Sequence, residues 1–227
     1  MTLLYNIGIA ILEMAYAFSI AVAMDALMVR GKVSNEISRK VIHLWMGGLI
    51  VFWFLYTAQY GEYLFLVTPL IWVGIMLHSM SPKSHYKATV KRFTRRNNIN
   101  EVVYGPLIFF MMFIVVTIIA FRSLGGVAAL CAMVFGDGVA PLVGRHANKH
   151  YLGGKKSIEG SIAVFAASFL STVAVFAYLF PAAPAKLFYA AAATSVVAAL
   201  VEALTPRNYD NLTVPIFVLA AFAVLLS

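Results

Sequence analysis

The chain alternates between long apolar stretches and short polar segments. Eight of the stretches are suited to membrane helices, since a helical span needs about 20 apolar residues. The pattern predicts spans at about 3–29, 41–58, 62–80, 102–121, 125–143, 160–180, 186–204 and 212–226. The first stretch is longer than a signal-peptide core and lacks a basic start, so we expect it to be retained as a span. The polar segments are then short loops on the two faces of a membrane.

The composition agrees with this pattern. Hydrophobic residues make up 62% of the 227 residues and charged residues 11%, whereas soluble domains have about 45–50% and about 25%. Cys131 is the only cysteine, which excludes an intrachain disulfide and a cysteine metal site. We therefore predict an all-α integral membrane protein with about eight transmembrane helices in one bundle. Residues 1–227 would form a single polytopic domain.

Positive charge lies almost entirely on one side of this predicted bundle. All of the 17 Lys and Arg residues except Arg122 and Lys186 fall in the first, third, fifth and seventh loops. Loops rich in Lys and Arg stay in the cytoplasm, so both termini are expected on the non-cytoplasmic side. The net charge of +8 is then explained by topology and by attraction to anionic headgroups. Because no soluble module presents this charge, we do not expect nucleic-acid binding.

The acidic residues show a second asymmetry. Glu13 lies within the first span and Glu62 at the outer face, but the other Asp and Glu residues map to the cytoplasmic loops or to the span ends beside them. Carboxylates contribute little to orientation, so topology does not account for their placement. A cation-dependent site on the cytoplasmic face would account for it. Glu13 could instead bind a lipid hydroxyl or pair within the bundle.

Asp137 is the strongest single candidate for this chemistry. It lies about two turns inside the cytoplasmic end of the fifth span, between Gly136 and Gly138. An acid near lipid is costly unless it is paired, and glycines on both sides allow a ligand or another backbone to approach closely. The pattern predicts a metal-binding or catalytic carboxylate. The alternative is an acid that pairs with a neighbouring Lys or Arg for packing.

A basic, glycine-rich segment enters the sixth span. Its candidate site residues are Gly153, Gly154, Lys155, Lys156, Ser157, Glu159 and Ser161. Free backbone N–H groups and the dipole at a helix start attract anions, and lysines supply point charges for phosphate. The segment therefore predicts a phosphate site, although a P-loop would need a glycine where Lys149 stands. In the alternative, Ser157 only caps the helix and the lysines only mark the inner face.

Three polar residues share one helical face at the start of the second span. They are Arg39, Lys40 and His43, which are three to four positions apart. The two bases could contact phosphates, and His43 could accept a proton or a hydrogen bond. The alternative is a pair of snorkelling interfacial bases beside a packed histidine.

A last polar group surrounds the turn between the seventh and eighth spans. Glu202 ends the seventh span, and Asp210 and Asn211 follow between Pro206 and Pro215. The carboxylates and the amide could contact a metal or a nucleotide. The alternative is that Asp210 or Asn211 only caps the last helix.

Five short motifs occur in a specific order along the chain. They are Arg39-Lys40-x-x-His43, Glu101-x-x-x-Gly105-Pro106, Gly136-Asp137-Gly138-x-Ala140-x-x-x-Gly144-Arg145, Lys156-Ser157-x-Glu159-Gly160-Ser161 and Asp210-Asn211-x-x-Val214-Pro215. Over roughly residues 36–216 the set resembles the family of dolichol kinases, phytol kinases and CTP-dependent diacylglycerol kinases. The resemblance implies a polytopic membrane enzyme that transfers the γ-phosphoryl group of CTP to a lipid alcohol. It also implies a divalent cation such as Mg²⁺.

The resemblance implies roles for individual residues as well. Asp137 would bind the metal or orient the hydroxyl, and Asp137 or His43 would receive the proton. The nucleotide-binding set would comprise Arg39, Lys40, Gly153, Gly154, Lys155, Lys156, Ser157, Glu159, Ser161, Asp210 and Asn211. The metal-binding set would comprise Asp137, Glu159 and Asp210.

We therefore expect a CTP-dependent kinase that phosphorylates a membrane lipid alcohol at the cytoplasmic interface, with a polyprenol or dolichol as the leading substrate. Phytol, geranylgeraniol and diacylglycerol are alternative substrates within the same family. A cytidylyltransferase that forms a CDP-lipid is an alternative reaction, and a non-enzymatic transporter with a broken helix is an alternative class. The expected partners are the lipid alcohol and the nucleotide triphosphate. The oligomeric state is left open.

Overall fold

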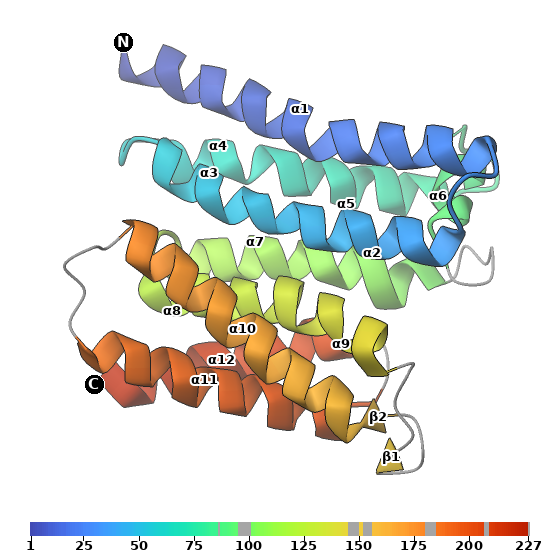
Figure 1. Ribbon diagram of the computed structural model, residues 1–227. Helices are drawn as coiled ribbons and strands as arrows, with labels where there is room; N and C mark the ends of the chain where they lie inside the picture. The colour runs from blue at the N-terminus through green and yellow to red at the C-terminus, as the bar shows by residue number, and fades with distance from the viewer. Residues whose placement is uncertain are drawn as a thin grey trace. The chain divides into compact units, whose positions relative to one another are not determined.

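The computed structural model describes residues 1–85, 87–94, 101–144, 150–151, 156–179, 185–206 and 209–226. Within these ranges the chain is helical apart from two short strands and the connecting turns (Figure 1). It divides into two compact units, Met1–Phe121 and Arg122–Ser227. The expectation that the whole chain acts as a single polytopic catalytic domain stays a prediction.

The apolar helices match the predicted spans. Within the described residues, six are long and apolar enough to cross a membrane, and two shorter ones cover Gly105–Ala120 and Asp210–Leu225. The six long helices are Thr2–Val29, Asn35–Leu55, Gly61–Ser79, Leu124–Gly144, Ile158–Leu179 and Ala185–Leu204. The prediction of an all-α integral membrane protein is therefore confirmed. The orientation of the termini stays a prediction.

The first unit consists of helices that pack around buried aromatic side chains. Its elements are α1 (Thr2–Val29), α2 (Asn35–Trp45), η1 (Met46–Gly48), α3 (Leu49–Leu55), α4 (Gly61–Phe65), α5 (Val67–Ser79), α6 (Lys87–Arg92), η2 (Val103–Leu107) and α7 (Ile108–Ala120). α2 begins after Ser34, whose Oγ accepts a hydrogen bond from the backbone N–H of Ile37 at 3.3 Å, as an N-cap does. Trp53, Phe65 and Phe113 are completely buried in this unit. α1 packs against α2, α3, α4 and α5, so the first span is a packing partner that these helices share.

Glu13 pairs within the first unit. The Tyr56 hydroxyl donates a hydrogen bond to Glu13 Oε2 at 2.5 Å. Glu13 is 0% exposed and Tyr56 2% exposed. The bond ties α1 to the residue that follows α3. Of the two possibilities that the sequence leaves open for Glu13, pairing within the bundle is the one that the structure shows.

Glu13→Leu should lower the stability of the protein. The substitution removes the acceptor of a buried tyrosine hydroxyl, and stranding a buried polar group costs about 1–3 kcal/mol. Glu13→Gln keeps an acceptor oxygen in the same place and is the matched control. Thermal unfolding in detergent should give a lower midpoint for Glu13→Leu than for Glu13→Gln. Equal midpoints would contradict a structural role for the pair.

The second unit is a helical bundle with a small β-hairpin at one end. Its elements are α8 (Leu124–Cys131), η3 (Ala132–Gly136), α9 (Asp137–Gly144), β1 (His150–Tyr151), β2 (Lys156–Ser157), α10 (Ile158–Leu179), α11 (Ala185–Leu204) and α12 (Asp210–Leu226). α11 packs against both α10 and α12. α8, η3 and α9 follow one another as a single apolar helix against α10 (Figure 1). The strands are antiparallel, with His150 opposite Ser157. This packing brings the ends of α9, α10, α11 and α12 to one region.

Candidate active site

A π-helical turn sets the position of Asp137. Asp137 is the first residue of α9 and follows the π-helical turn η3. Such turns inside α-helices are frequent at functional sites because the extra residue redirects the side chains that follow. Gly136 ends this turn against α10, where an added Cβ would meet Ser168 Oγ and would lie 3.2 Å from Val164 Cγ1. The absence of a side chain at Gly136 therefore allows the close approach of η3 to α10.

A second close approach fixes the start of α10. A Cβ added at Gly144 would lie 2.9 Å from Ser157 Oγ, and one added at Gly160 would lie 3.1 Å from the same atom. Ser157 Oγ accepts a hydrogen bond from the backbone N–H of Gly160 at 3.1 Å, which caps the first turn of α10. Small residues allow helices to approach closely in membranes. The capping role of Ser157 is therefore observed, and its nucleotide-binding role stays a prediction.

Three carboxylates from three helices converge in the second unit. One oxygen from each of Asp137, Glu202 and Asp210 lies within 4.8 Å of the other two. They come from α9, α11 and α12, and we call them the carboxylate cluster. Glu202 is 5% exposed and the Asp210 side chain 13% exposed, so these two members of the cluster are largely withdrawn from solvent. Three carboxylates so close together repel one another, and either a nearby cation or protonation of one carboxyl group relieves that repulsion.

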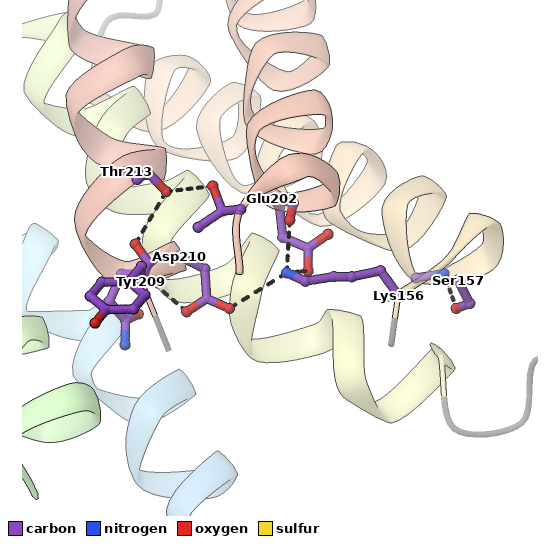
Figure 2. Close-up of polar contacts among 9 residues, drawn as sticks. Lys156, Ser157, Glu202, Tyr209, Asp210 and Thr213 are labelled. Carbon is purple, nitrogen blue, oxygen red and sulfur yellow. Dashed lines mark hydrogen bonds and ion pairs between the residues drawn. The ribbon is translucent and has the colours of Figure 1, made fainter. Parts of the chain in front are cut away.

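Lys156 reaches into the carboxylate cluster from β2 (Figure 2). Its Nζ forms an ion pair with Glu202 Oε1 and donates a hydrogen bond to the Glu202 carbonyl oxygen at 2.7 Å. The same Nζ lies 3.7 Å from Asp210 Oδ2. The lysine therefore bridges α11 and α12. The sequence predicts phosphate as its partner, and that contact stays a prediction.

Hydrogen bonds hold the turn between α11 and α12. The hydroxyls of Thr205 and Thr213 lie 2.9 Å apart. Thr213 Oγ1 donates a hydrogen bond to the Tyr209 carbonyl oxygen at 3.1 Å (Figure 2). The backbone N–H of Asn211 donates to Asp210 Oδ1 at 3.2 Å. These contacts orient Asp210 at the start of α12. Asn211 is buried, and its Oδ1 accepts no hydrogen bond from the part of the chain that the structure describes.

The remaining predicted residues of the sixth span are partly described. Glu159 and Ser161 lie in the first two turns of α10. Glu159 Oε2 is buried, and no described residue hydrogen bonds with it. Among the described residues, the cluster of three carboxylates does not include Glu159. Three predicted nucleotide contacts lie outside the described residues, namely Gly153, Gly154 and Lys155.

The basic motif of the second span belongs to the first unit. Arg39, Lys40 and His43 lie in α2, and Lys40 is 8% exposed. The His43 ring packs against Phe109, with ring centroids 4.5 Å apart. The packed histidine that the sequence offers as an alternative is therefore observed. The proposed contacts of all three residues with a nucleotide stay predictions.

Glu202 is missing from the metal set that the resemblance implies, although the sequence offers it as a possible metal or nucleotide contact. Its sequence signal is an acid in the last turn of an otherwise apolar helix, close to the polar turn that contains Asp210. Only the packing of α11 against α10 and α12 shows that it faces Asp137. Asp137 and Asp210, by contrast, were both in the predicted set, and the structure brings them together.

The donor atoms of the carboxylate cluster suit a hard divalent cation. Mg²⁺ and Ca²⁺ bind oxygen ligands at about 2.0–2.6 Å, so oxygens around one ion lie up to about 4–5 Å apart. The oxygens of Asp137, Glu202 and Asp210 lie within 4.8 Å of one another. Small side-chain movements would therefore allow all three to bind one ion. Carboxylate oxygens are also the ligands that these cations prefer.

Comparison with known proteins gives the class of protein. The chain is 31% identical to "Probable phytol kinase, chloroplastic" of Triticum aestivum, over 94% of this chain and 75% of that protein. It is 28% identical to "Phytol kinase 1, chloroplastic" of Arabidopsis thaliana, over 97% and 77%. It is also 28% identical to "Phytol kinase" of Synechocystis sp., over 80% and 76%. No protein-family model and no solved structure matches the chain.

The chain is a bundle of membrane helices, and its sequence is similar to those of proteins named phytol kinase. It is therefore a membrane-bound kinase that phosphorylates a lipid alcohol. The resemblance that the ordered motifs indicate is thereby confirmed. The chain belongs to the phytol kinase family. Its relatives are named kinases, which favours phosphoryl transfer over the cytidylyltransferase and transporter alternatives.

Proposed function

We propose that this protein transfers the γ-phosphoryl group of CTP to phytol or a closely similar isoprenoid alcohol in the membrane. The names of the relatives favour this substrate over the polyprenol or dolichol that the motifs first suggest. Geranylgeraniol has the same kind of tail and hydroxyl and belongs to the same proposal. The observation that carries the proposal is the convergence of three carboxylates and Lys156 at the ends of membrane helices.

In this proposal the carboxylate cluster holds Mg²⁺. The ion, when bound, offsets negative charge on the transferred phosphoryl group. Asp137, Glu202 and Asp210 contribute the ligands from three separate helices. Phosphoryl transfer depends mainly on positioning and electrostatics, and helix ends fixed by close packing provide both. Glu159 is an additional candidate for contacts to a lysine or to the metal, because one of its oxygens is buried with no described hydrogen-bond partner.

The lipid and the donor approach this site from different phases. The isoprenoid tail stays in the bilayer, and its hydroxyl reaches the ends of α9, α11 and α12. We propose that Asp137 receives the hydroxyl proton while the hydroxyl oxygen bonds to the γ-phosphorus. The bond from that phosphorus to the β-phosphate oxygen breaks in the same step, and CDP leaves. The triphosphate approaches from water, and we propose that this side is the cytoplasm because Lys and Arg are concentrated there.

The proposal is tested with purified protein in nanodiscs that contain phytol, geranylgeraniol, dolichol or diacylglycerol. With γ-labelled CTP and Mg²⁺, we expect label in the phosphates of phytol and geranylgeraniol. Parallel reactions with γ-labelled ATP determine the donor. α-Labelled CTP should leave the lipid unlabelled, whereas label in the lipid would indicate a cytidylyltransferase. No labelled lipid from any combination would reject the proposed function.

Removal of divalent cations should abolish phosphoryl transfer. EDTA would strip the ion from Asp137, Glu202 and Asp210, leaving the triphosphate facing three carboxylates. The measurement is labelled lipid in the nanodisc assay, with EDTA that has been saturated with Mg²⁺ as the control. Activity should return when excess Mg²⁺ is added. Full activity in metal-free EDTA would contradict a metal role for the cluster.

A further inference from the structure

Lys156 occupies the carboxylate cluster instead of extending into solvent (Figure 2). Its ammonium group pairs with Glu202 Oε1, donates to the Glu202 carbonyl oxygen at 2.7 Å and lies 3.7 Å from Asp210 Oδ2. The side chains of Lys156, Glu202 and Asp210 are 11%, 7% and 13% exposed. A lysine that served only to attract phosphate from solution would keep its charged head in water. The ammonium group is therefore the counter-ion of the cluster.

Lys156 engages two of the three carboxylates that a divalent cation would need. Glu202 and Asp210 both belong to the set whose ligand atoms lie within 4.8 Å of one another. A unit charge and a double charge a few ångströms apart repel strongly where solvent screening is weak. The ammonium group and a metal ion are therefore alternatives at these carboxylates.

We propose that Lys156 is the resident cation of the ligand-free carboxylate cluster, and that a divalent cation displaces its ammonium group toward the donor phosphates. The second half of this statement rests on the proposed function. Lysine suits such an exchange because its charge is compact and lies at the end of a flexible four-carbon stem. Lys156 lies one residue before the capping residue of α10, so the head group changes partners without unwinding the helix.

The exchange makes metal binding and nucleotide binding cooperative. A metal ion that enters alone must separate Lys156 from Glu202 and leave the ammonium group without a carboxylate. A metal ion that enters with a triphosphate provides new partners for that ammonium group, because lysine binds phosphate well. Each ligand therefore raises the affinity for the other by the same factor.

The first test compares Mn²⁺ binding to Lys156→Met and to the wild type, in nanodiscs without nucleotide. Electron paramagnetic resonance of free Mn²⁺ gives the affinity. Lys186→Met is the matched control, because Lys186 is exposed at the start of α11 and its removal changes the net charge equally. We expect Lys156→Met to bind Mn²⁺ at least about tenfold more tightly, which corresponds to about 1.4 kcal/mol. Equal or weaker binding than in the wild type would overturn the proposal.

A second test uses the wild type alone, which avoids any loss of folding in the variant. Lys156 is labelled with an amine-reactive reagent, and its rate of modification is followed by mass spectrometry. Saturating Mn²⁺ should raise the rate for Lys156 several-fold by expelling the ammonium group. The rate for Lys186 should not change. A rate for Lys156 that saturating Mn²⁺ leaves unaltered would count against the exchange.

Neither measurement uses nucleotide or a lipid alcohol, so this inference and the proposed function can fail separately. Tighter Mn²⁺ binding in Lys156→Met, together with no lipid phosphorylation by the wild type, would reject the donor and acceptor but retain the exchange. Phosphorylation of phytol, together with an unchanged Mn²⁺ affinity in Lys156→Met, would reject the exchange alone.

Discussion

Asp137→Asn is expected to reduce lipid phosphorylation by about 10²–10³-fold or more, which is the range for removal of one preorganised electrostatic group from an active site. The substitution keeps the shape of the side chain but removes a negative charge from the carboxylate cluster. Both proposed roles of Asp137, as a metal ligand and as an acceptor of the hydroxyl proton, need that charge. The measurement is the initial rate of label transfer from CTP to phytol in nanodiscs.

The matched control for this prediction is Glu62→Gln. Glu62 lies in α4 of the first unit, at the face opposite to the predicted active site in the sequence-based topology. Its loss of charge should leave the rate unchanged. Size-exclusion profiles and thermal midpoints should show that Asp137→Asn folds. A folded Asp137→Asn protein with the wild-type rate would place the chemistry elsewhere.

Gly136→Ala should reduce activity by about 10²-fold, although it adds only a methyl group. The new Cβ would meet Ser168 Oγ and would lie 3.2 Å from Val164 Cγ1, so η3 would have to move away from α10. Overpacking of this kind typically costs about 1–3 kcal/mol in stability. Asp137 is the next residue, and a displacement of about 1 Å at an active site can lower a rate about 10²-fold.

Ser168→Ala tests the steric cause of this effect. Ser168 Oγ is buried and has no hydrogen-bond partner among the described residues, so Ser168→Ala alone should leave stability and activity nearly unchanged. The double variant with Gly136→Ala should recover part of the lost rate, because the atom nearest to the new methyl group is gone. Gly74→Ala, which places a methyl group where no heavy atom lies within 4 Å, controls for the change in helix propensity. If Ser168→Ala gives no recovery, the contact with Ser168 is not the cause of the loss.

Close packing against α10 underlies the expected effects of both substitutions. η3 approaches α10 closely at Gly136, and α9 does so at Gly144 and Gly160, where a side chain would meet a serine hydroxyl. These contacts fix Asp137 and the residue before the cap of α10, which is Lys156. The carboxylate cluster is therefore held by backbone packing on one side and by the hydrogen-bonded turn between α11 and α12 on the other. Rigid placement of charge is what phosphoryl transfer requires from a protein.

The sequence by itself determined the number and position of the membrane helices. A span must satisfy all of its backbone hydrogen bonds internally and must be about 20 residues long, so the apolar stretches correspond directly to helices. It also determined the family, because the polar residues that interrupt these stretches form an ordered set of motifs. The resemblance also implies Asp137, Glu159 and Asp210 as metal ligands, and acids beside lipid are rare enough to mark candidates such as Asp137.

Only the tertiary structure decided how these polar residues combine. In a membrane helix the lipid-facing side and the protein-facing side are both apolar, so the hydrophobic pattern specifies the length of a helix but not its rotation. Rotation is what turns Glu202 toward Asp137 and Asp210, and what brings Tyr56 to Glu13 across 43 positions of sequence. The partner of Lys156 depends on the same packing. Its charge predicts an anion, and the arrangement of α10, α11 and α12 makes that anion a carboxylate.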